Sequence, residues 1–154
     1  MRGQIEPFDF NLTVFESIVD NIPSAVFLKD VTDGFRLKIW NKAAEITFEM
    51  PKSEILGKTT HEKWDKELAD LYTAVDFEVV KNGKSILIEE EPCYTPQRSH
   101  FYVRTQKIPL LVGDQKEVKY LLCICDDITE QKKTKQKTDE ILNQLKEAQS
   151  IAKI

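Results

Sequence analysis

The sequence predicts an α+β fold in which helices cover one face of a five-stranded antiparallel sheet. Three observations support this prediction. Two strand-like runs at 24–30 and 35–41 come first, the segment 41–83 has helical periodicity, and three further strand-like runs occupy 84–125. Strands that follow one another in groups, instead of alternating with helices, are typical of antiparallel sheets with segregated helices.

The composition is that of one globular domain. The chain has 154 residues, of which 41% are apolar and 31% are charged, and its formal net charge is −4. Because the lysines are dispersed up to Thr129, no nucleic-acid partner is expected. No apolar run approaches the roughly 18 residues that span a bilayer, and Met1 to Phe10 lack the basic start and apolar centre of a signal peptide. We therefore expect a cytoplasmic location and no membrane insertion in this region, although a longer parent protein could carry membrane helices elsewhere.

The three cysteines predict no special chemistry. Cys93, Cys123 and Cys125 form no CxxC pair, so neither a disulfide framework nor a metal site is expected. Cys123 and Cys125 share one face of a predicted strand, where small apolar side chains fill a core.

An amphipathic helix is predicted before the core. Leu12, Phe15, Val19 and Ile22 recur at spacings of three and four and are followed by Pro23. Four apolar side chains are more than a small core needs at that point. We expect them to pack on a partner chain or on the C-terminal helix.

The first two strands flank Asp33–Gly34, a pair that is typical of hairpin turns. Asn41 can cap the helical segment that follows. The longest helix of the core is predicted at 65–83, where Gly83 ends it. Its predicted buried stripe consists of Leu68, Leu71, Val75 and Val79.

Three strands are predicted at 84–91, 99–111 and 117–125. The glutamates Glu89–Glu91 are expected to be a solvated charge run that protects the edge of the sheet. Alternation within 99–111 divides the side chains into two faces. One face carries His100, Tyr102 and Arg104, and the other carries Phe101, Val103 and Thr105.

The segment from Asp127 onward contains neither Gly nor Pro and predicts a long helix. Its apolar positions follow the spacing of a short coiled-coil seam, and a homodimer is therefore expected. These positions are Ile141, Leu145, Ala148 and Ala152. A single helix that lies on a neighbouring domain is the alternative.

Four segments, in order, resemble the PAS sensor domains with their C-terminal PAC segment, and the resemblance covers Phe15 to Lys133. The segments are IVDNIPSAVFLKD, IWNKAAE, SEILGKT and KIPLLVGDQKEVKYLLCICDDITEQK. The resemblance implies an N-terminal flanking helix over 1–22, a PAS core over 23–128, and a signalling or coiled-coil helix over 129–154. That helix is expected to lead to a further domain of the same polypeptide, because the last residues resemble the approach to another PAS repeat.

The resemblance also implies an output junction. The triplet Asp127-Ile128-Thr129 is similar to the family's link between the last strand and the signalling helix. Asp127 can accept hydrogen bonds from the first free N–H groups of the helix, and Glu130 can reach back as in a capping box. We expect Asp127, Ile128, Thr129 and Glu130 to transmit a signal.

PAS pockets hold haem, flavin, small acids or nothing, so the cofactor stays unknown at this stage. Haem needs an axial imidazole, and neither His61 nor His100 is well placed for one. The region 58–68 lacks the cysteine of the photoactive flavin members, whereas Trp40 and Trp64 leave non-covalent flavin open.

A small ligand is the remaining candidate, and its contacts are predicted by position. The predicted ligand-binding residues are Phe27, Ile39, Trp64, Leu71, Tyr72 and Arg104, with His61 and Tyr102 nearby. If the Phe101 face of its strand is the core face, Arg104 lies outside. No nucleophile–base pair is framed by a catalytic motif, so the chain itself is not expected to be an enzyme.

The leading hypothesis is a cytoplasmic sensory and dimerisation module of a multidomain bacterial signalling protein, a two-component sensor histidine kinase. Two alternatives keep the fold: a ligand-free dimerisation scaffold, and the sensory module of a diguanylate cyclase or phosphodiesterase. A third is an α+β enzyme with an internal pocket, which predicts a buried Asp or Glu beside His100.

Overall fold

The computed structural model describes residues 8–114 and 116–153, and its centre is one five-stranded antiparallel sheet. The strand order is β2-β1-β5-β4-β3, so the first hairpin lies beside the last strand of the chain. The strands are β1 (Ala25–Asp30), β2 (Arg36–Trp40), β3 (Ile86–Cys93), β4 (Phe101–Leu110) and β5 (Tyr120–Asp127). The predicted fold class is confirmed. Residues 1–7 of the predicted flanking segment and residue 154 of the terminal segment lie outside the described residues.

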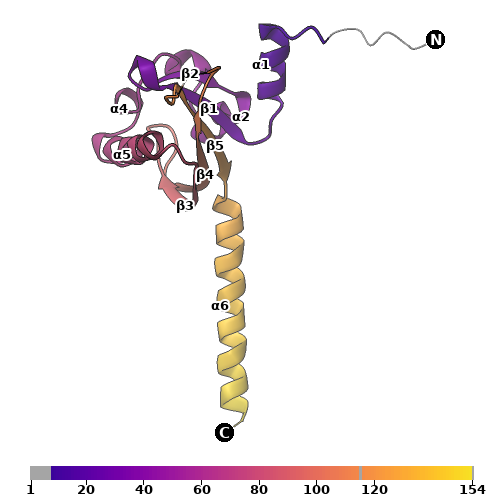
Figure 1. Cartoon of the computed structure of the whole chain (residues 1–154). Helices are drawn as coiled ribbons and strands as arrows, with labels where there is room; N and C mark the ends of the chain where they lie inside the picture. Colours follow the sequence, from indigo (N-terminus) through magenta and orange to yellow (C-terminus); the bar gives the residue numbers. More distant parts are fainter. Residues whose placement is uncertain (1–7, 115, 154) are drawn as a thin grey trace, which may run out of the picture.

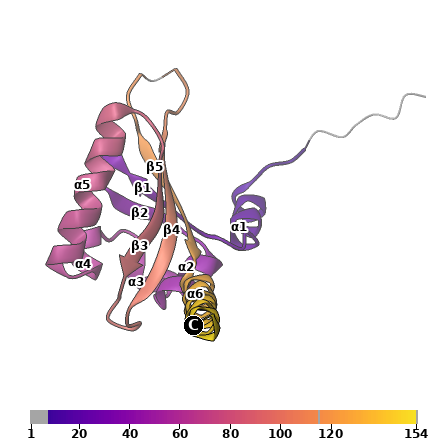
Figure 2. The ribbon, with the colours of Figure 1, turned by 90° about the horizontal axis from the view of Figure 1, so that it is seen from below.

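The helices occupy both sides of this sheet. They are α1 (Leu12–Asp20), the 3-10 turn η1 (Val31–Asp33), α2 (Lys42–Phe48), α3 (Lys52–Ile55), α4 (Thr60–Lys63), α5 (Lys66–Asn82) and α6 (Thr129–Ala152). Helices α4 and α5 lie on one side of the sheet and α1 on the other (Figure 2). Helix α6 continues from β5 and extends away from the domain (Figure 1). Within the described residues, no helix has the length and apolar character that crossing a membrane requires.

Helix α5 begins and ends as its sequence predicts, but its buried face is different. The Asp65 side chain accepts a hydrogen bond from the Leu68 N–H at 3.0 Å, and Gly83 ends the helix in the left-handed conformation at φ 61°. The buried residues are Leu68, Ala69, Tyr72, Asp76 and Val79. Leu71 is 54% exposed, so its place in the predicted stripe was wrong. The stripe runs through Asp76, a charged residue that hydrophobic periodicity leaves out.

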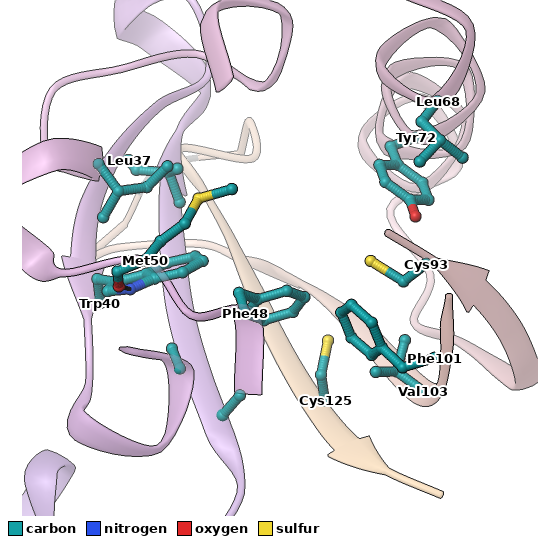
Figure 3. Packing of buried hydrophobic residues seen from close by; sticks show 13 residues of the cluster. Leu37, Trp40, Phe48, Met50, Leu68, Tyr72, Cys93, Phe101, Val103 and Cys125 are labelled. Atoms are coloured by element: carbon teal, nitrogen blue, oxygen red, sulfur yellow. Dashed lines mark hydrogen bonds between the residues drawn. The ribbon is translucent and has the colours of Figure 1, made fainter. Parts of the chain in front are cut away.

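An aromatic cluster fills the core near the junction of β1, β2 and α2. The ring of Phe48 lies 5.2 Å from that of Trp40 and 6.0 Å from that of Phe101, measured between centroids. Phe27 packs 5.9 Å from Phe48 in an edge-on arrangement. Figure 3 shows Phe48 between Trp40 and Phe101, with Tyr72 approaching from α5.

Asn41 joins three elements and is itself buried. Its side-chain oxygen accepts hydrogen bonds from the N–H groups of Val26 (2.8 Å) and Ala44 (2.9 Å), which confirms that it caps α2. Its amide nitrogen donates to the Val19 carbonyl at 2.9 Å. The end of α1 is thereby held against the start of the core.

Helix α1 uses part of its apolar face within the chain. Val19 is buried, Phe15 and Ile22 are half-buried, and Leu12 is 70% exposed. A groove between α1, β2 and α3 is lined by Leu12, Phe15, Val19, Ile39 and Leu56, among others. Val19 therefore packs largely in its own domain, and packing of Leu12, Phe15 and Ile22 on a partner chain or on the C-terminal helix stays a prediction.

Strand β3 contains a bulge near its middle. Ile88 pairs with Thr105 of β4, but the next paired residue is Glu91, opposite Val103. Glu89 and Glu90 therefore both point outward and are exposed, whereas Glu91 returns to the inner face and is half-buried. The prediction of a solvated run holds for the first two glutamates and fails for the third.

Candidate functional site

A cavity of about 40 Å³ lies between the inner face of the sheet and helices α4 and α5. Its apolar walls include Phe27, Leu37, Phe48, Trp64, Tyr72 and Val103, and its polar lining consists of Lys29, Thr60, Glu91, Thr105 and Lys107. Pockets for drug-sized ligands usually enclose several hundred Å³. This cavity has room for a much smaller molecule.

Three of the six predicted ligand-binding residues line this cavity, namely Phe27, Trp64 and Tyr72. Ile39 instead faces the groove beside α1, because β-strand alternation turns it away from buried Trp40. Leu71 is on the exposed side of α5. These two placements were wrong, and ligand binding by Phe27, Trp64 and Tyr72 stays a prediction.

Arg104 also lies outside the cavity, so its predicted place in the ligand site was wrong. Phe101, Val103 and Thr105 are the buried residues of β4, so the face that carries Arg104 is outward, where its Nε lies 3.6 Å from Glu89 Oε2. Tyr102 shares that outward face.

Both histidines are on the surface. His61 Nε2 lies 2.8 Å from Asp70 Oδ1 in an exposed pair, and exposed His100 packs edge-on to the Tyr94 ring at 5.4 Å. Buried Asp76 pairs with Lys29 and Lys107, and half-buried Glu91 lines the cavity, so neither carboxyl group is the partner of His100 that the enzyme hypothesis predicts.

A buried charge cluster forms one end of the site. Lys29 of β1 and Lys107 of β4 lie on either side of β5, and both donate to Asp76 of α5. The Lys29 ammonium is 2.6 Å from Asp76 Oδ2 and 2.9 Å from Thr60 Oγ1, and the Lys107 ammonium bonds Asp76 Oδ1. The carboxylate of Asp76 therefore joins α5 to two strands, and Lys29 adds α4 through Thr60.

The ionisation of this cluster follows from its pairing. Burial by itself would raise the pKa of Asp76, but the charges of Lys29 and Lys107 outweigh it and hold that pKa below its usual value. Burial would lower the pKa of Lys107, and the charge of Asp76 reverses this and raises it. Asp76 and Lys107 are therefore both charged at neutral pH.

Glu91 has a different environment from Asp76. Its Oε1 accepts a hydrogen bond from Thr105 Oγ1 at 3.2 Å, and burial raises the pKa of its carboxyl above the usual value, although Lys107 opposes this. Sequence reasoning missed Lys29, Asp76, Glu91 and Lys107, because charged residues were assigned to the surface. A signal was present at Lys107, which continues the buried alternation Phe101, Val103 and Thr105 along β4.

The cavity cysteines are protonated. Burial raises the pKa of Cys93 to about 11 and raises that of Cys125 as well, so neither is a thiolate nucleophile at neutral pH. Among the described residues, no group of three or more His, Cys, Asp or Glu side chains could hold a metal ion.

The junction between β5 and α6 is short and hydrogen-bonded to Tyr102 of β4. The N–H groups of Ile128 and Tyr102 bond across it: Ile128 donates to the Tyr102 carbonyl at 2.9 Å, and Tyr102 donates to Thr129 Oγ1 at 3.0 Å. Asp127 Oδ1 accepts from both the N–H (3.0 Å) and the hydroxyl (2.6 Å) of Thr129. The first residue of α6 is thus fixed to the sheet on two sides.

Asp127 has a second partner that extends this junction. Its Oδ2 pairs with Arg98 at 2.7 Å, and Arg98 also donates to the Thr47 carbonyl at 2.7 Å and covers the Phe101 ring at 3.9 Å. Burial acts to raise the pKa of Asp127, but the bonds from Thr129 and Arg98 hold it below the usual value.

Glu130 does not form the predicted capping box. Ile128 is the N-cap of α6, so Glu130 is the second helical residue and not the third, and its carboxylate pairs instead with Lys133 at 3.7 Å. The Thr129 hydroxyl takes part in holding the helix start, which the capping prediction did not anticipate.

A further contact ties α6 to the bulge of β3. The Lys132 ammonium lies 2.9 Å from Glu90 Oε2 and 3.7 Å from the centre of the Tyr102 ring. The adjacent residue Glu91 lines the cavity. The bulge therefore connects the cavity wall, through two consecutive glutamates, to the first turns of the helix.

Comparison with known proteins assigns the fold to a family. The family model described as the PAS fold matches residues 19–133. No curated protein matches the chain. A solved RNA-binding light-oxygen-voltage receptor aligns with a TM-score of 0.68 and 16% identity over 90% of this chain, which spans 41% of the receptor.

Two other solved structures are covered almost completely. The PAS domain of Bordetella pertussis BvgS aligns with a TM-score of 0.62 and 20% identity over 86% of this chain and 97% of that one. The PAS domain of nitrogen regulation protein NR(II) from Vibrio parahaemolyticus aligns with a TM-score of 0.55 and 19% identity over 77% of this chain and 100% of that one. Such identities show a shared fold, and the family match extends over most of the sequence. The chain belongs to the PAS fold family.

Proposed function

We propose that this chain is the cytoplasmic sensory and dimerisation module of a multidomain bacterial signalling protein, a two-component sensor histidine kinase. In this proposal the cavity receives a small ligand, and the resulting change in the sheet alters the position of α6. The observation that carries the proposal is the direct connection of β5 to α6 through Ile128, with Thr129 bonded to Tyr102 of the neighbouring strand.

Such a junction suits transmission because it has no flexible linker. A shift of β4 relative to β5 moves the atoms that hold Thr129, so the helix must tilt or rotate with the sheet. A difference of about 1–3 kcal/mol between two helix positions is enough for regulatory coupling. The similarity to the PAS domain of a nitrogen regulation protein agrees with a regulatory role.

The dimerisation part of the proposal rests on α6. Its seam of Ile141, Leu145, Ala148 and Ala152 is exposed along the helix, and Ile141 and Leu145 are 48% and 55% exposed. Leu12 of α1 is exposed as well. Two copies of α6 packed along this seam would bury it and bring two downstream domains together.

Distances between two spin labels test the transmission. The labels go on cysteines introduced at Lys81 of α5 and Glu147 of α6, which are both exposed, while the three native cysteines are buried. Thr129→Val keeps the side-chain shape but removes the hydroxyl, so we expect a broader distance distribution. Thr134→Val, at an exposed position on the same helix, is the control. Equal distributions in both variants would contradict the proposed role of the junction.

A ligand-free dimerisation scaffold is the second candidate, and the small cavity volume of about 40 Å³ favours it. Native mass spectrometry of the freshly purified chain separates the two candidates. A dimer that releases a small molecule supports the sensory module, and a bare dimer supports the scaffold. A bare monomer contradicts the dimerisation that both candidates share.

A further inference from the structure

Glu91 lines the cavity without a counter-charge at ion-pair distance among the described residues. Lys29 and Lys107 both bond to Asp76, and neither ammonium group lies within 4.0 Å of a Glu91 oxygen. The one side-chain hydrogen bond that Glu91 accepts in the described part of the chain comes from Thr105 Oγ1, at 3.2 Å. A neutral carboxyl group can stay in such a place, whereas a carboxylate needs more donors or a positive charge. The two protonation states of Glu91 therefore favour different surroundings.

The groups that face Glu91 come from four strands and one helix. Lys29 of β1 and Lys107 of β4 favour its charged form, whereas burial and the charge of Asp76 of α5 oppose it, and burial is the largest effect. The pKa of Asp76 is lowered and that of Lys107 is raised, so both stay charged while Glu91 titrates. The facing thiol and phenol groups stay protonated because burial raises the pKa of each, and they belong to Tyr72 of α5, Cys93 of β3, and Cys123 and Cys125 of β5. Glu91 is thus the cavity carboxyl group whose charge changes at a pH above the usual glutamate range.

The bulge of β3 is a part of the sheet that can move with Glu91. Between the paired residues Ile88 and Glu91, β3 has two residues where β4 has one. The extra residue interrupts the ladder of hydrogen bonds. In addition, β3 is an edge strand, so β4 is its one neighbouring strand. A displacement of Glu91 is therefore taken up first by the bulge and not by the centre of the sheet.

Glu90 connects this bulge to α6. Its carboxylate points outward, and its Oε2 lies 2.9 Å from the Lys132 ammonium, which also lies 3.7 Å from the centre of the Tyr102 ring. The N–H of Tyr102 in turn donates to the hydroxyl of Thr129, the first residue of α6. Glu90 and Glu91 are consecutive, so one bulge has a carboxyl group in the cavity and another on the output helix.

We propose that Glu91 is a proton-operated switch, in which its protonation state sets the conformation of the β3 bulge and Glu90 passes that conformation to Lys132 of α6. The protonated carboxyl group stays in the cavity beside Thr105. The ionised group is drawn toward the Lys107 ammonium, which displaces the bulge and loosens the contact between Glu90 and Lys132. This inference rests on the proposed function because α6 is the output, but the input is a proton and the route does not pass through the β5–α6 junction.

A pH titration of the isotope-labelled full chain by NMR tests the switch. The side-chain carboxyl of Glu91 and the backbone amide of Lys132 are followed in the same samples. We expect the Lys132 amide to show a step whose midpoint coincides with that of the Glu91 carboxyl and lies above the ordinary glutamate value of about 4.3. A Lys132 amide without a step at the Glu91 midpoint would overturn the proposal.

Glu91→Gln tests whether Glu91 is the source of that step. Glutamine has the size of the protonated glutamate and does not titrate, so the Lys132 amide should lose the step and keep its low-pH position at every pH. Glu89→Gln is the matched control, because Glu89 belongs to the same bulge but is exposed, and it should retain the step. A step that persists in Glu91→Gln would assign it to another group and overturn the proposal.

Glu90→Met tests the route from the bulge to α6. This change removes the acceptor of the Lys132 ammonium and leaves Glu91 in place. The Glu91 carboxyl should still titrate, whereas the step at Lys132 should lose most of its amplitude. Glu89→Met is the control and should retain the full step. A full step at Lys132 in Glu90→Met would show that Glu90 does not carry the change, contrary to the proposal.

The proton switch and the proposed function can fail separately. If Lys132 shows no step at the Glu91 midpoint but Thr129→Val broadens the spin-label distances, the switch is wrong and transmission through the β5–α6 junction remains. If Lys132 follows Glu91 but Thr129→Val leaves the distances unchanged, the switch stands and the role of that junction is wrong.

Discussion

Lys29 and Asp76 form an ion pair of 2.6 Å in which both side chains are almost completely buried, although 47 positions separate them in the chain. The pair joins β1 to the middle of α5. Because Lys107 bonds the other oxygen of the same carboxylate, α5 is attached to the sheet on both sides of β5. Asp76 therefore adds an ionic attachment to the apolar packing of Leu68, Tyr72 and Val79 that holds the longest core helix.

Replacing Asp76 should destabilise the domain severely. Asp76→Asn leaves two buried ammonium groups without their counter-ion, and the loss of one partner from a buried pair costs about 3–5 kcal/mol. The measurement is the free energy of unfolding in urea. Asp70→Asn is the matched control, because Asp70 forms exposed pairs with Lys66 and His61 that contribute little to stability. Equal losses in the two variants would show that the buried cluster is not what holds α5.

Glu91 should make stability depend on pH with a definite sign. The pKa of its carboxyl is raised in the folded state. The stabilisation that Glu91 contributes is therefore fully present below the pKa of the unfolded chain, about 4.3, and is lost as the pH rises through the pKa of the folded state. Glu91→Gln mimics the protonated form. Its stability relative to the wild type should therefore increase with pH across that window and then level off.

Urea unfolding at a series of pH values checks the Glu91 prediction. Glu89→Gln removes a neighbouring carboxylate that is exposed on the outer face, so its difference from the wild type should stay nearly flat. A Glu91→Gln curve that runs parallel to the wild type, or falls below it as the pH rises, would contradict the raised pKa.

Two leucines on α5 test which face of the helix is buried. Leu68→Ala removes core packing and should cost about 2–4 kcal/mol, whereas Leu71→Ala should stay within about 0.5 kcal/mol because Leu71 is exposed. The chemical change is the same in both variants, so each serves as the control for the other. A large loss of stability in Leu71→Ala would show that Leu71 is buried, as hydrophobic spacing predicts.

The seam of α6 should decide the oligomeric state. The double change Ile141→Asp and Leu145→Asp puts charges in the centre of the proposed seam and should convert a dimer to a monomer in sedimentation velocity. Asn143→Asp adds a charge away from that seam and should leave the dimer intact. A dimer that survives the double change would move the interface away from α6, and α1 with exposed Leu12 would then be the next surface to test.

Local pattern was sufficient for most elements. The Asp33–Gly34 turn, the Asn41 cap and the end of α5 at Gly83 all depend on residues close in sequence, whose backbone preferences act before any tertiary contact forms. The alternation along β4 divided its side chains into two faces correctly but left open which face is buried, and Arg104, which was predicted to bind a ligand, lies on the outer one. The long α6 follows from a segment without Gly or Pro.

The site was less predictable because its polar residues are buried only through distant partners. From the sequence, Asp76 is expected at the surface, and only its pairing with Lys29 and Lys107 explains its burial. Glu91 is expected to belong to a solvated run, but the bulge in β3 turns it inward. One added residue in a strand moves every later side chain of that strand to the opposite face of the sheet.

The sequence by itself therefore determined the order of the elements, the alternation of β4 and the PAS resemblance, since these depend on short-range periodicity and turn chemistry. Only the tertiary structure decided which charges are buried, which face of α5 packs on the sheet and how Thr129 is held by Tyr102. The physical reason is that a charged or polar side chain is stable inside a protein only with its partners in place, and these partners come from strands and helices far apart in the chain.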